Sequence, residues 1–119
     1  MRRLLLVAGL CALALPATAA AKTTYCSSTG DFCTSASKVK GVRHLRITTF
    51  AFTGRVRICV KGLSLARVCH GFRLAKTGPA YGLDLIWKRH YPNRGNGLYR
   101  VWFFLGATRL GPVLTFRQP

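Results

Sequence analysis

Two cysteines, Cys59 and Cys69, constrain the fold more than any other residues of this chain. Each lies within a segment in which apolar and polar side chains alternate, residues 55–61 and 67–75. Such alternation is typical of β-strands, because successive side chains point to opposite faces of a sheet. We therefore expect the two segments to form a β-hairpin in which a disulfide joins the cysteines across the strands.

The alternation also predicts the register of this hairpin. A shift by one residue would turn one apolar row to the opposite side of the sheet, so the two rows stay together only with the cysteines face to face. The expected cross-strand pairs are Ile58 with His70, Val60 with Val68, Arg55 with Arg73 and Lys61 with Arg67. The first two pairs lie on the apolar face, where His70 is expected in the core. The last two set like charges opposite each other, which destabilises a sheet and suggests that the cations are used or well solvated.

Two further cysteines, Cys26 and Cys33, enclose a short polar loop. An even number of cysteines in a small exported chain is typical of disulfides, although four cysteines allow three pairings. Once Cys59 is joined to Cys69, elimination leaves Cys26 with Cys33. Six and nine residues separate the members of these pairs, more than the two to four that place two thiolates on one zinc ion. We therefore expect no metal site, and because no motif in the sequence specifies a ligand, we expect no cofactor.

The beginning of the chain, residues 1–21, has the pattern of a secretory signal peptide. An arginine pair precedes an apolar run over residues 4–15, and small residues follow up to Ala21, after which we expect cleavage. The run is shorter than the ~20 residues that a membrane-spanning helix needs, and no later segment approaches that length, so a retained anchor is the weaker alternative. The pattern predicts a secreted, extracytoplasmic protein whose single domain spans residues 22–119 and lacks the fifth cysteine, Cys11.

From Val42 onward the chain consists of alternating segments separated by Gly and Pro, which is typical of short strands. The segments that we expect to be strands are residues 42–52, 55–61, 67–75, 81–91, 98–105 and 109–117. A further short strand is expected within residues 22–26 or 34–39. Strands at such intervals predict an all-β domain, a single antiparallel β-sandwich of about seven strands, with a small barrel as the alternative.

The run Gly97-Leu98-Tyr99-Arg100-Val101 resembles the tyrosine corner of immunoglobulin-like and fibronectin type III sandwiches. In that family a tyrosine near the start of the sixth strand donates a hydrogen bond back to the preceding crossover, a role that the resemblance gives to Tyr99. The sequence departs from the family at Gly95, where an acidic residue is common, and in lacking the antibody-type disulfide between the sheets. The whole chain is similar to small exported bacterial immunoglobulin-like proteins of unknown function, which implies a fold and a compartment but no activity.

Charge is the most unusual property of the sequence. The full chain contains 19 lysines and arginines against two acidic residues, Asp31 and Asp84, and has a formal net charge of +17. Such a surface attracts polyanions such as nucleic acid, anionic lipid or cell-wall polymer, although basic residues also protect strand edges from aggregation. With no glutamate, paired-carboxylate glycosidases and H-E-x-x-H metalloproteases are poor matches. Asp31 is expected to close a turn and Asp84 to form a cross-strand ion pair.

The resemblance also implies where the basic residues gather. In a fibronectin-like arrangement four segments share one sheet: residues 55–61, 67–75, 98–105 and 109–117. Alternation then turns Tyr99 to the core and Trp102 outward. The candidate binding residues on this outward side are Arg55, Arg57, Lys61, Arg67, Arg73, Arg100 and Trp102. We expect a non-catalytic binding module whose partner is an anionic polymer or a protein at the cell surface; the alternative is that an N-terminal segment or a second protomer covers Trp102.

Two other functions fit this composition. A small basic hydrolase, chiefly a nuclease, would use two histidines and a lysine as acid, base and phosphate clamp, and His44 and His90 are the histidines outside the expected core. A purely structural envelope protein or a membrane-active cationic protein is the other alternative. Nothing in the spacing of the sequence brings His44 to His90, so we expect no catalytic residues.

Overall fold

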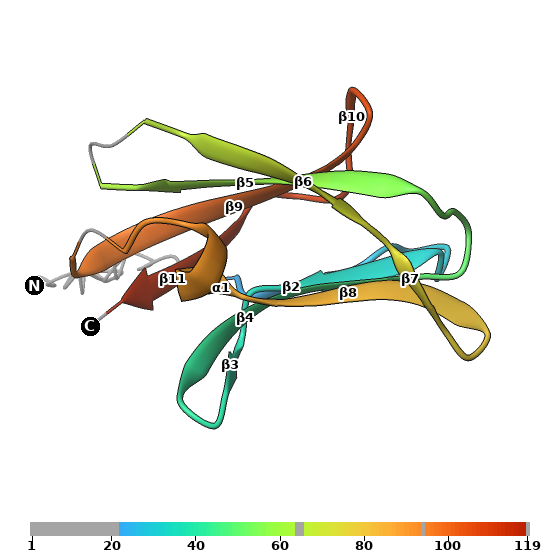
Figure 1. Cartoon of the computed structure of the whole chain (residues 1–119), viewed down its shortest axis with the longest axis horizontal. Coiled ribbons are helices and arrows are strands. Elements are labelled where there is room, and N and C mark those ends of the chain that lie inside the picture. Colours follow the sequence, from blue (N-terminus) through green and yellow to red (C-terminus); the bar gives the residue numbers. More distant parts are fainter. Residues whose placement is uncertain (1–21, 64–65, 94, 119) are drawn as a thin grey trace, which may run out of the picture.

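Two antiparallel sheets lie one above the other in the computed structural model (Figure 1). The structure describes residues 22–63, 66–93 and 95–118. An all-β fold with two disulfides is therefore confirmed. The expected signal peptide and its cleavage site lie outside the described residues and stay predictions.

The first sheet has six strands in the order β1-β2-β4-β8-β7, with β3 also paired to β4. Its strands are β1 (Thr24–Cys26), β2 (Phe32–Ser35), β3 (Lys38–Val39), β4 (Val42–Thr49), β7 (Ala75–Thr77) and β8 (Ala80–Ile86). Alternate residues of β4 are buried, among them Leu45 and Ile47, because this side of the sheet covers the core. Both alternative N-terminal regions form strands, since β1 and β2 pair with each other beside β4.

The second sheet has five strands in the order β10-β9-β5-β6, and β11 pairs with β9. Its strands are β5 (Arg55–Gly62), β6 (Val68–Arg73), β9 (Gly97–Leu105), β10 (Thr108–Arg109) and β11 (Leu114–Gln118). The prediction that the four segments given above share one sheet is confirmed, apart from the last residues of segment 67–75. Ala75 begins β7, because the chain crosses to the first sheet at Leu74, whose side chain is buried and whose amide donates to the carbonyl of Gly54.

Two other expected strands are interrupted. Segment 109–117 is divided between β10 and β11 by a turn at Gly111 and Pro112, and proline has no N–H for a ladder. Segment 81–91 ends as a strand at Ile86 and continues as α1 (Trp87–His90). Four residues advance about 13 Å along a strand but about 6 Å along a helix. The helical turn therefore keeps two buried residues, Trp87 and Tyr91, one turn apart, and the Tyr91 amide donates to the Trp87 carbonyl at 3.0 Å.

The register of the β5–β6 hairpin is confirmed. Cys59 lies opposite Cys69 and is joined to it by a disulfide, and Ile58 lies opposite His70. The second expected disulfide, between Cys26 and Cys33, is also present. Of the two like-charged pairs, Arg55–Arg73 is in the ladder, whereas the ladder ends at Val60–Val68, one position before Lys61–Arg67.

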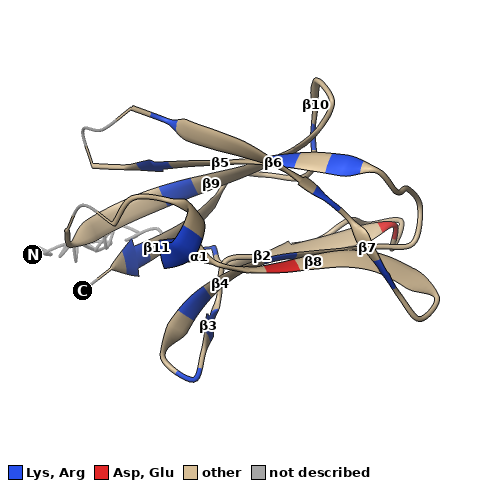
Figure 2. Cartoon of the chain, in the orientation of Figure 1, with Lys and Arg blue, Asp and Glu red and all other residues tan. Residues whose placement is uncertain are grey.

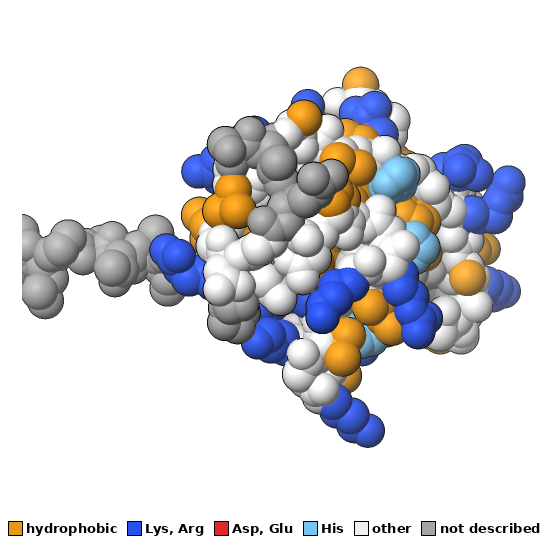
Figure 3. Space-filling view, turned by 60° about the vertical axis from the view of Figure 1, so that its left-hand side comes forward, with side chains coloured by type: hydrophobic (Ala, Val, Ile, Leu, Met, Phe, Trp, Pro, Cys, Tyr) orange, Lys and Arg blue, Asp and Glu red, His pale blue; other side chains and the backbone are white. Residues whose placement is uncertain are grey.

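The placement of His70 in the core is wrong. The side chain points to the expected side of β6 but is exposed, because β6 is the last strand of its sheet and the facing layer does not cover it fully. Instead, the imidazole packs against Phe72 and Tyr91, with ring centroids 6.4 and 5.1 Å apart. In Figure 3 histidine side chains are visible among lysines, arginines and hydrophobic side chains, on a face where no acidic side chain is seen.

Aromatic rings from both sheets meet in the core. Trp87, which follows β8, contacts Tyr99 and Phe116 of the second sheet edge to face, with centroids 4.9 and 5.0 Å apart. Tyr99 and Phe116 stack on each other at 5.3 Å. The Tyr99 hydroxyl donates to the carbonyl of Gly95 at 2.9 Å, which is the bond that the tyrosine-corner resemblance implies. The Tyr91 hydroxyl likewise donates to the carbonyl of Ile58 at 2.6 Å, and burial raises the pKa of Tyr91.

One cation, Arg43, is buried at the edge of this cluster, which was not among the predictions made above. Its guanidinium donates to the carbonyls of Ala36 at 2.8 Å and Arg117 at 3.3 Å. It also stacks on Phe116, with 4.4 Å between Cζ and the ring centroid. Burial lowers the pKa of Arg43, although an arginine stays protonated at neutral pH. Arg43 therefore connects β4 of the first sheet with β11 of the second.

Candidate functional site

The outward side of the second sheet, here called the outer face, carries all seven candidate binding residues. In β5, Val56, Ile58 and Val60 are buried. In β9 the buried residues are Tyr99, Val101 and Phe103. Side chains of the opposite parity point away from the core, as predicted from the alternation. Arg55, Arg57, Arg67, Arg73 and Arg100 are exposed, and Lys61 and Trp102 are partly exposed.

Cross-strand pairing orders the outer face into rows that run across the strands. In one row Phe104 lies between two arginines, because it pairs with Arg57 of β5 on one side and with Arg109 of β10 on the other. The Arg57 guanidinium stacks on the Phe104 ring, with 5.0 Å between Cζ and the centroid. Arg109 is absent from the residues predicted above, because only the pairing of β10 with β9 brings it here.

The next row contains the disulfide and Trp102. Cys59 pairs with Cys69 on one side and with Trp102 on the other, and it is fully buried although it points outward. The Arg67 guanidinium stacks over the Trp102 ring, with 5.1 Å between Cζ and the centroid. The described N-terminal segment meets this sheet at Thr115 of β11, through hydrogen bonds from and to Lys22. Among the described residues, the side chain that covers Trp102 is therefore Arg67. The N-terminal segment contacts the sheet at its edge strand β11, through Lys22.

No carboxylate side chain lies in the second sheet as far as the structure describes it. The two acidic residues of the chain are Asp31, in the loop before β2, and Asp84, in β8. Figure 2 shows both on the first sheet, while basic residues are spread over both. The like charges of Arg55 and Arg73 face each other, but the Arg55 guanidinium extends over Gly71, where an added Cβ would lie 3.4 Å from Nη2. Solvation and side-chain length therefore reduce the repulsion without any acidic partner.

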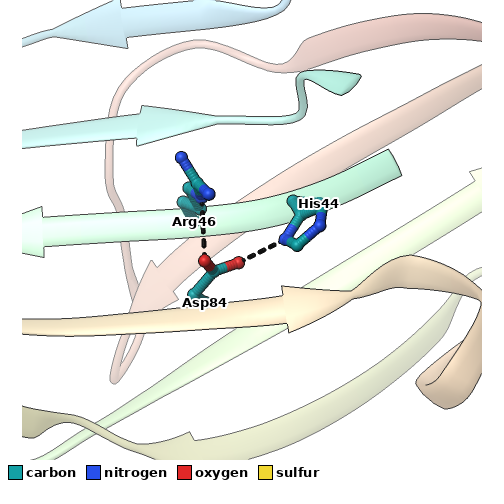
Figure 4. Close-up of polar contacts among 3 residues, drawn as sticks. All are labelled: His44, Arg46 and Asp84. Carbon is teal, nitrogen blue, oxygen red and sulfur yellow. Dashed lines mark hydrogen bonds and ion pairs between the residues drawn. The ribbon is translucent and has the colours of Figure 1, made fainter. Parts of the chain in front are cut away.

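The histidines of the proposed nuclease have different neighbours. His44 Nδ1 lies 2.7 Å from Asp84 Oδ1, and Arg46 Nε donates to Asp84 Oδ2 at 3.0 Å (Figure 4). His90 instead packs edge to face on Phe72, with centroids 5.2 Å apart. The described residues hold no group of three or more His, Cys, Asp or Glu placed to bind one metal ion.

The cross-strand ion pair expected for Asp84 is confirmed, with Arg46 and His44 as its partners. Partial burial alone would raise the pKa of the Asp84 carboxyl, but the hydrogen bonds from His44 and Arg46 and their charges outweigh it and lower the pKa. A carboxyl whose pKa is lowered by folding stabilises the protein above its unfolded pKa, and this stabilisation is lost as the pH falls through the folded value.

Asp84→Asn is therefore expected to lower the free energy of unfolding near neutral pH and to have no effect in strong acid, at about pH 2. Asp84 is half exposed, so solvent screening keeps the loss below about 1 kcal/mol. Urea unfolding of both proteins at several pH values measures the difference. A difference that stays constant down to strong acid would contradict this assignment of the pair.

No described helix is long and apolar enough to cross a membrane. Comparison with known proteins adds no functional assignment to this geometry: no protein-family model matches the chain, and neither a characterised protein nor a solved structure is significantly similar to it.

Proposed function

We propose that this chain is a secreted, non-catalytic module with an immunoglobulin-like sandwich fold that binds an anionic polymer through the outer face. Two observations support the fold. The orders β2-β4-β8-β7 and β11-β9-β5-β6 match the A-B-E-D and G-F-C-C′ orders of such sandwiches when the strands are lettered along the chain. The Tyr99–Gly95 hydrogen bond supports the same family.

The proposed binding function rests on the charges of the outer face. Basic residues from four strands and the loop before β6 point outward on one sheet, and the described part of that sheet contains no carboxylate to neutralise them. Cations that lack acidic neighbours attract an anionic polymer, and they release its counterions when it binds. Binding should therefore weaken steeply as the salt concentration rises.

A charge-matched pair of variants tests the face. We expect the triple variant Arg55→Ser, Arg57→Ser, Arg73→Ser to bind the sulfated polysaccharide heparin about tenfold or more weakly at low salt, and with a smaller salt dependence. The control Lys38→Ser, Lys40→Ser, Lys76→Ser removes the same charge from exposed positions of the first sheet and its β3–β4 turn.

Isothermal calorimetry across a salt series measures both proteins, and thermal unfolding checks that each is folded. Equal losses in the two variants would mean that net charge, rather than the outer face, holds the polymer. Wild-type protein that fails to bind heparin at low salt would refute the proposed function.

A further inference from the structure

We infer that the anionic polymer is a single-stranded nucleic acid whose bases stack on the outer face; this inference rests on the proposed function and deepens it. The observation behind it is a pair of aromatic rings. Trp102 and Phe104 lie two positions apart on β9, point outward and are partly exposed. Charge alone would not require exposed rings, whereas bases offer flat partners for them.

The spacing of the two rings favours a single-stranded nucleic acid over a duplex. Residues two positions apart on a strand are about 6.8 Å apart, roughly twice the 3.4 Å rise per nucleotide of one strand in duplex DNA. Consecutive bases reach Trp102 and Phe104 only if the nucleic acid is unstacked and extended. The bases of a duplex are stacked on each other and have no free face to offer, so a duplex should use the basic residues alone.

The basic residues lie where the phosphates of such a strand would run. Arg57 and Arg109 flank Phe104 on both sides. Beyond Trp102, the next row across the sheet contains Lys61 opposite Arg100. Cations thus flank Phe104 and occupy the row beyond Trp102, so the outer face combines rings and charge, as do sheets that bind single strands by stacking and by charge together.

An arginine side chain already stacks on each ring. A base therefore has to displace the guanidinium or insert between the guanidinium and the ring. Arg67 covers Trp102 and Arg57 covers Phe104. A cation–π contact at an exposed site contributes about two- to fivefold in an equilibrium constant, whereas stacking of a base on an aromatic side chain contributes about five- to 150-fold. Exchange therefore favours the base, and the released arginine can contact a phosphate or the outer face of the base.

The test compares a single-stranded probe with an abasic probe of the same charge and with two other polyanions. Wild-type protein is titrated with an oligodeoxythymidine of about 15 nucleotides, an abasic oligonucleotide of the same length, the matching duplex, and heparin. We expect the abasic probe to bind about tenfold or more weakly than oligodeoxythymidine, because it has phosphates but no stacking partners. Fluorescence anisotropy of labelled probes at low salt gives the affinities.

Variants test whether Trp102 and Phe104 account for the preference for probes with bases. The double variant Trp102→Leu, Phe104→Leu keeps apolar volume over the disulfide; it should lose about tenfold or more for oligodeoxythymidine and less than about threefold for heparin. The control Phe50→Leu removes a ring that is 63% exposed after β4 of the other sheet and should change neither. If the double variant fails to fold, the comparison of probes on wild-type protein still decides.

Each outcome separates this inference from the proposed function. Three outcomes would overturn the inference and leave the polyanion proposal standing. They are equal binding of the abasic and thymidine probes, duplex binding as tight as single-strand binding, and equal losses of affinity for heparin and oligodeoxythymidine in the double variant. Absence of binding to every probe would refute the proposed function, and the inference with it.

Discussion

Replacing Arg43 with alanine is expected to lower the free energy of unfolding by about 3–5 kcal/mol, among the largest effects of any single substitution in this protein. Arg43 is 8% exposed, and its guanidinium stacks on Phe116. Its loss leaves a cavity beside the ring and removes the donors from the carbonyls of Ala36 and Arg117. Arg117 belongs to β11 of the second sheet, whereas Ala36 directly follows β2 of the first sheet, so the contact between the two layers weakens at the same time.

A second substitution separates volume from charge. Arg43→Met keeps most of the apolar stem against Phe116 and removes the buried charge, whose desolvation opposes folding. We expect it to cost about 1–2 kcal/mol, mainly for the two carbonyls that lose a donor. Chemical denaturation of both variants with unchanged m-values measures the difference. A negligible loss for alanine would show that Arg43 does not connect the sheets, and equal losses for alanine and methionine would show that the stem contributes nothing by packing on Phe116.

The sequence predicts local pairing well, because two independent patterns agree there. The spacing of Cys59 and Cys69 and the alternation around them demand one register, which the structure has. The outward direction of Trp102 follows from the same period of two once the resemblance places Tyr99 in the core, and the structure has Trp102 on that side. Properties that depend on two residues within one hairpin or one strand can therefore be predicted from the sequence alone.

Properties that depend on a third element cannot be predicted in this way. His70 has the parity of a core residue, but its burial depends on how far the opposite sheet extends beyond β6. Arg109 reaches the outer face only through the pairing of β10 with β9. Arg43 has the parity of the buried residues of β4, but the burial of a cation there depends on partners such as Phe116, which is 73 positions away in the chain. Sequence periodicity gives the face of a strand, but not what covers that face.

The packing of the aromatic cluster in the core also depends on residues from different strands, so alternation alone does not predict it. Gly62 lies at the end of β5 directly opposite Tyr99 of β9. A Cβ added at Gly62 would lie under 3.0 Å from three atoms of the Tyr99 ring. This ring is 1% exposed, and its hydroxyl is bonded to Gly95. It has little freedom to move, because Trp87 and Phe116 pack against it.

Gly62→Ala is therefore expected to destabilise the fold by about 3 kcal/mol or more, at the upper end of what one excess methyl group costs in a packed core. Gly71→Ala is the matched control, because this glycine lies on the neighbouring strand β6 and faces outward, where the atom nearest to the new methyl would be the guanidinium end of Arg55 at 3.4 Å. Alanine suits a strand slightly better than glycine, so the control should be neutral or more stable by up to about 1 kcal/mol. Thermal and urea unfolding of the two variants gives both values. If Gly62→Ala unfolds like Gly71→Ala, the close approach of β5 to the Tyr99 ring is wrong, and with it the packing that turns Trp102 and Phe104 to the outer face.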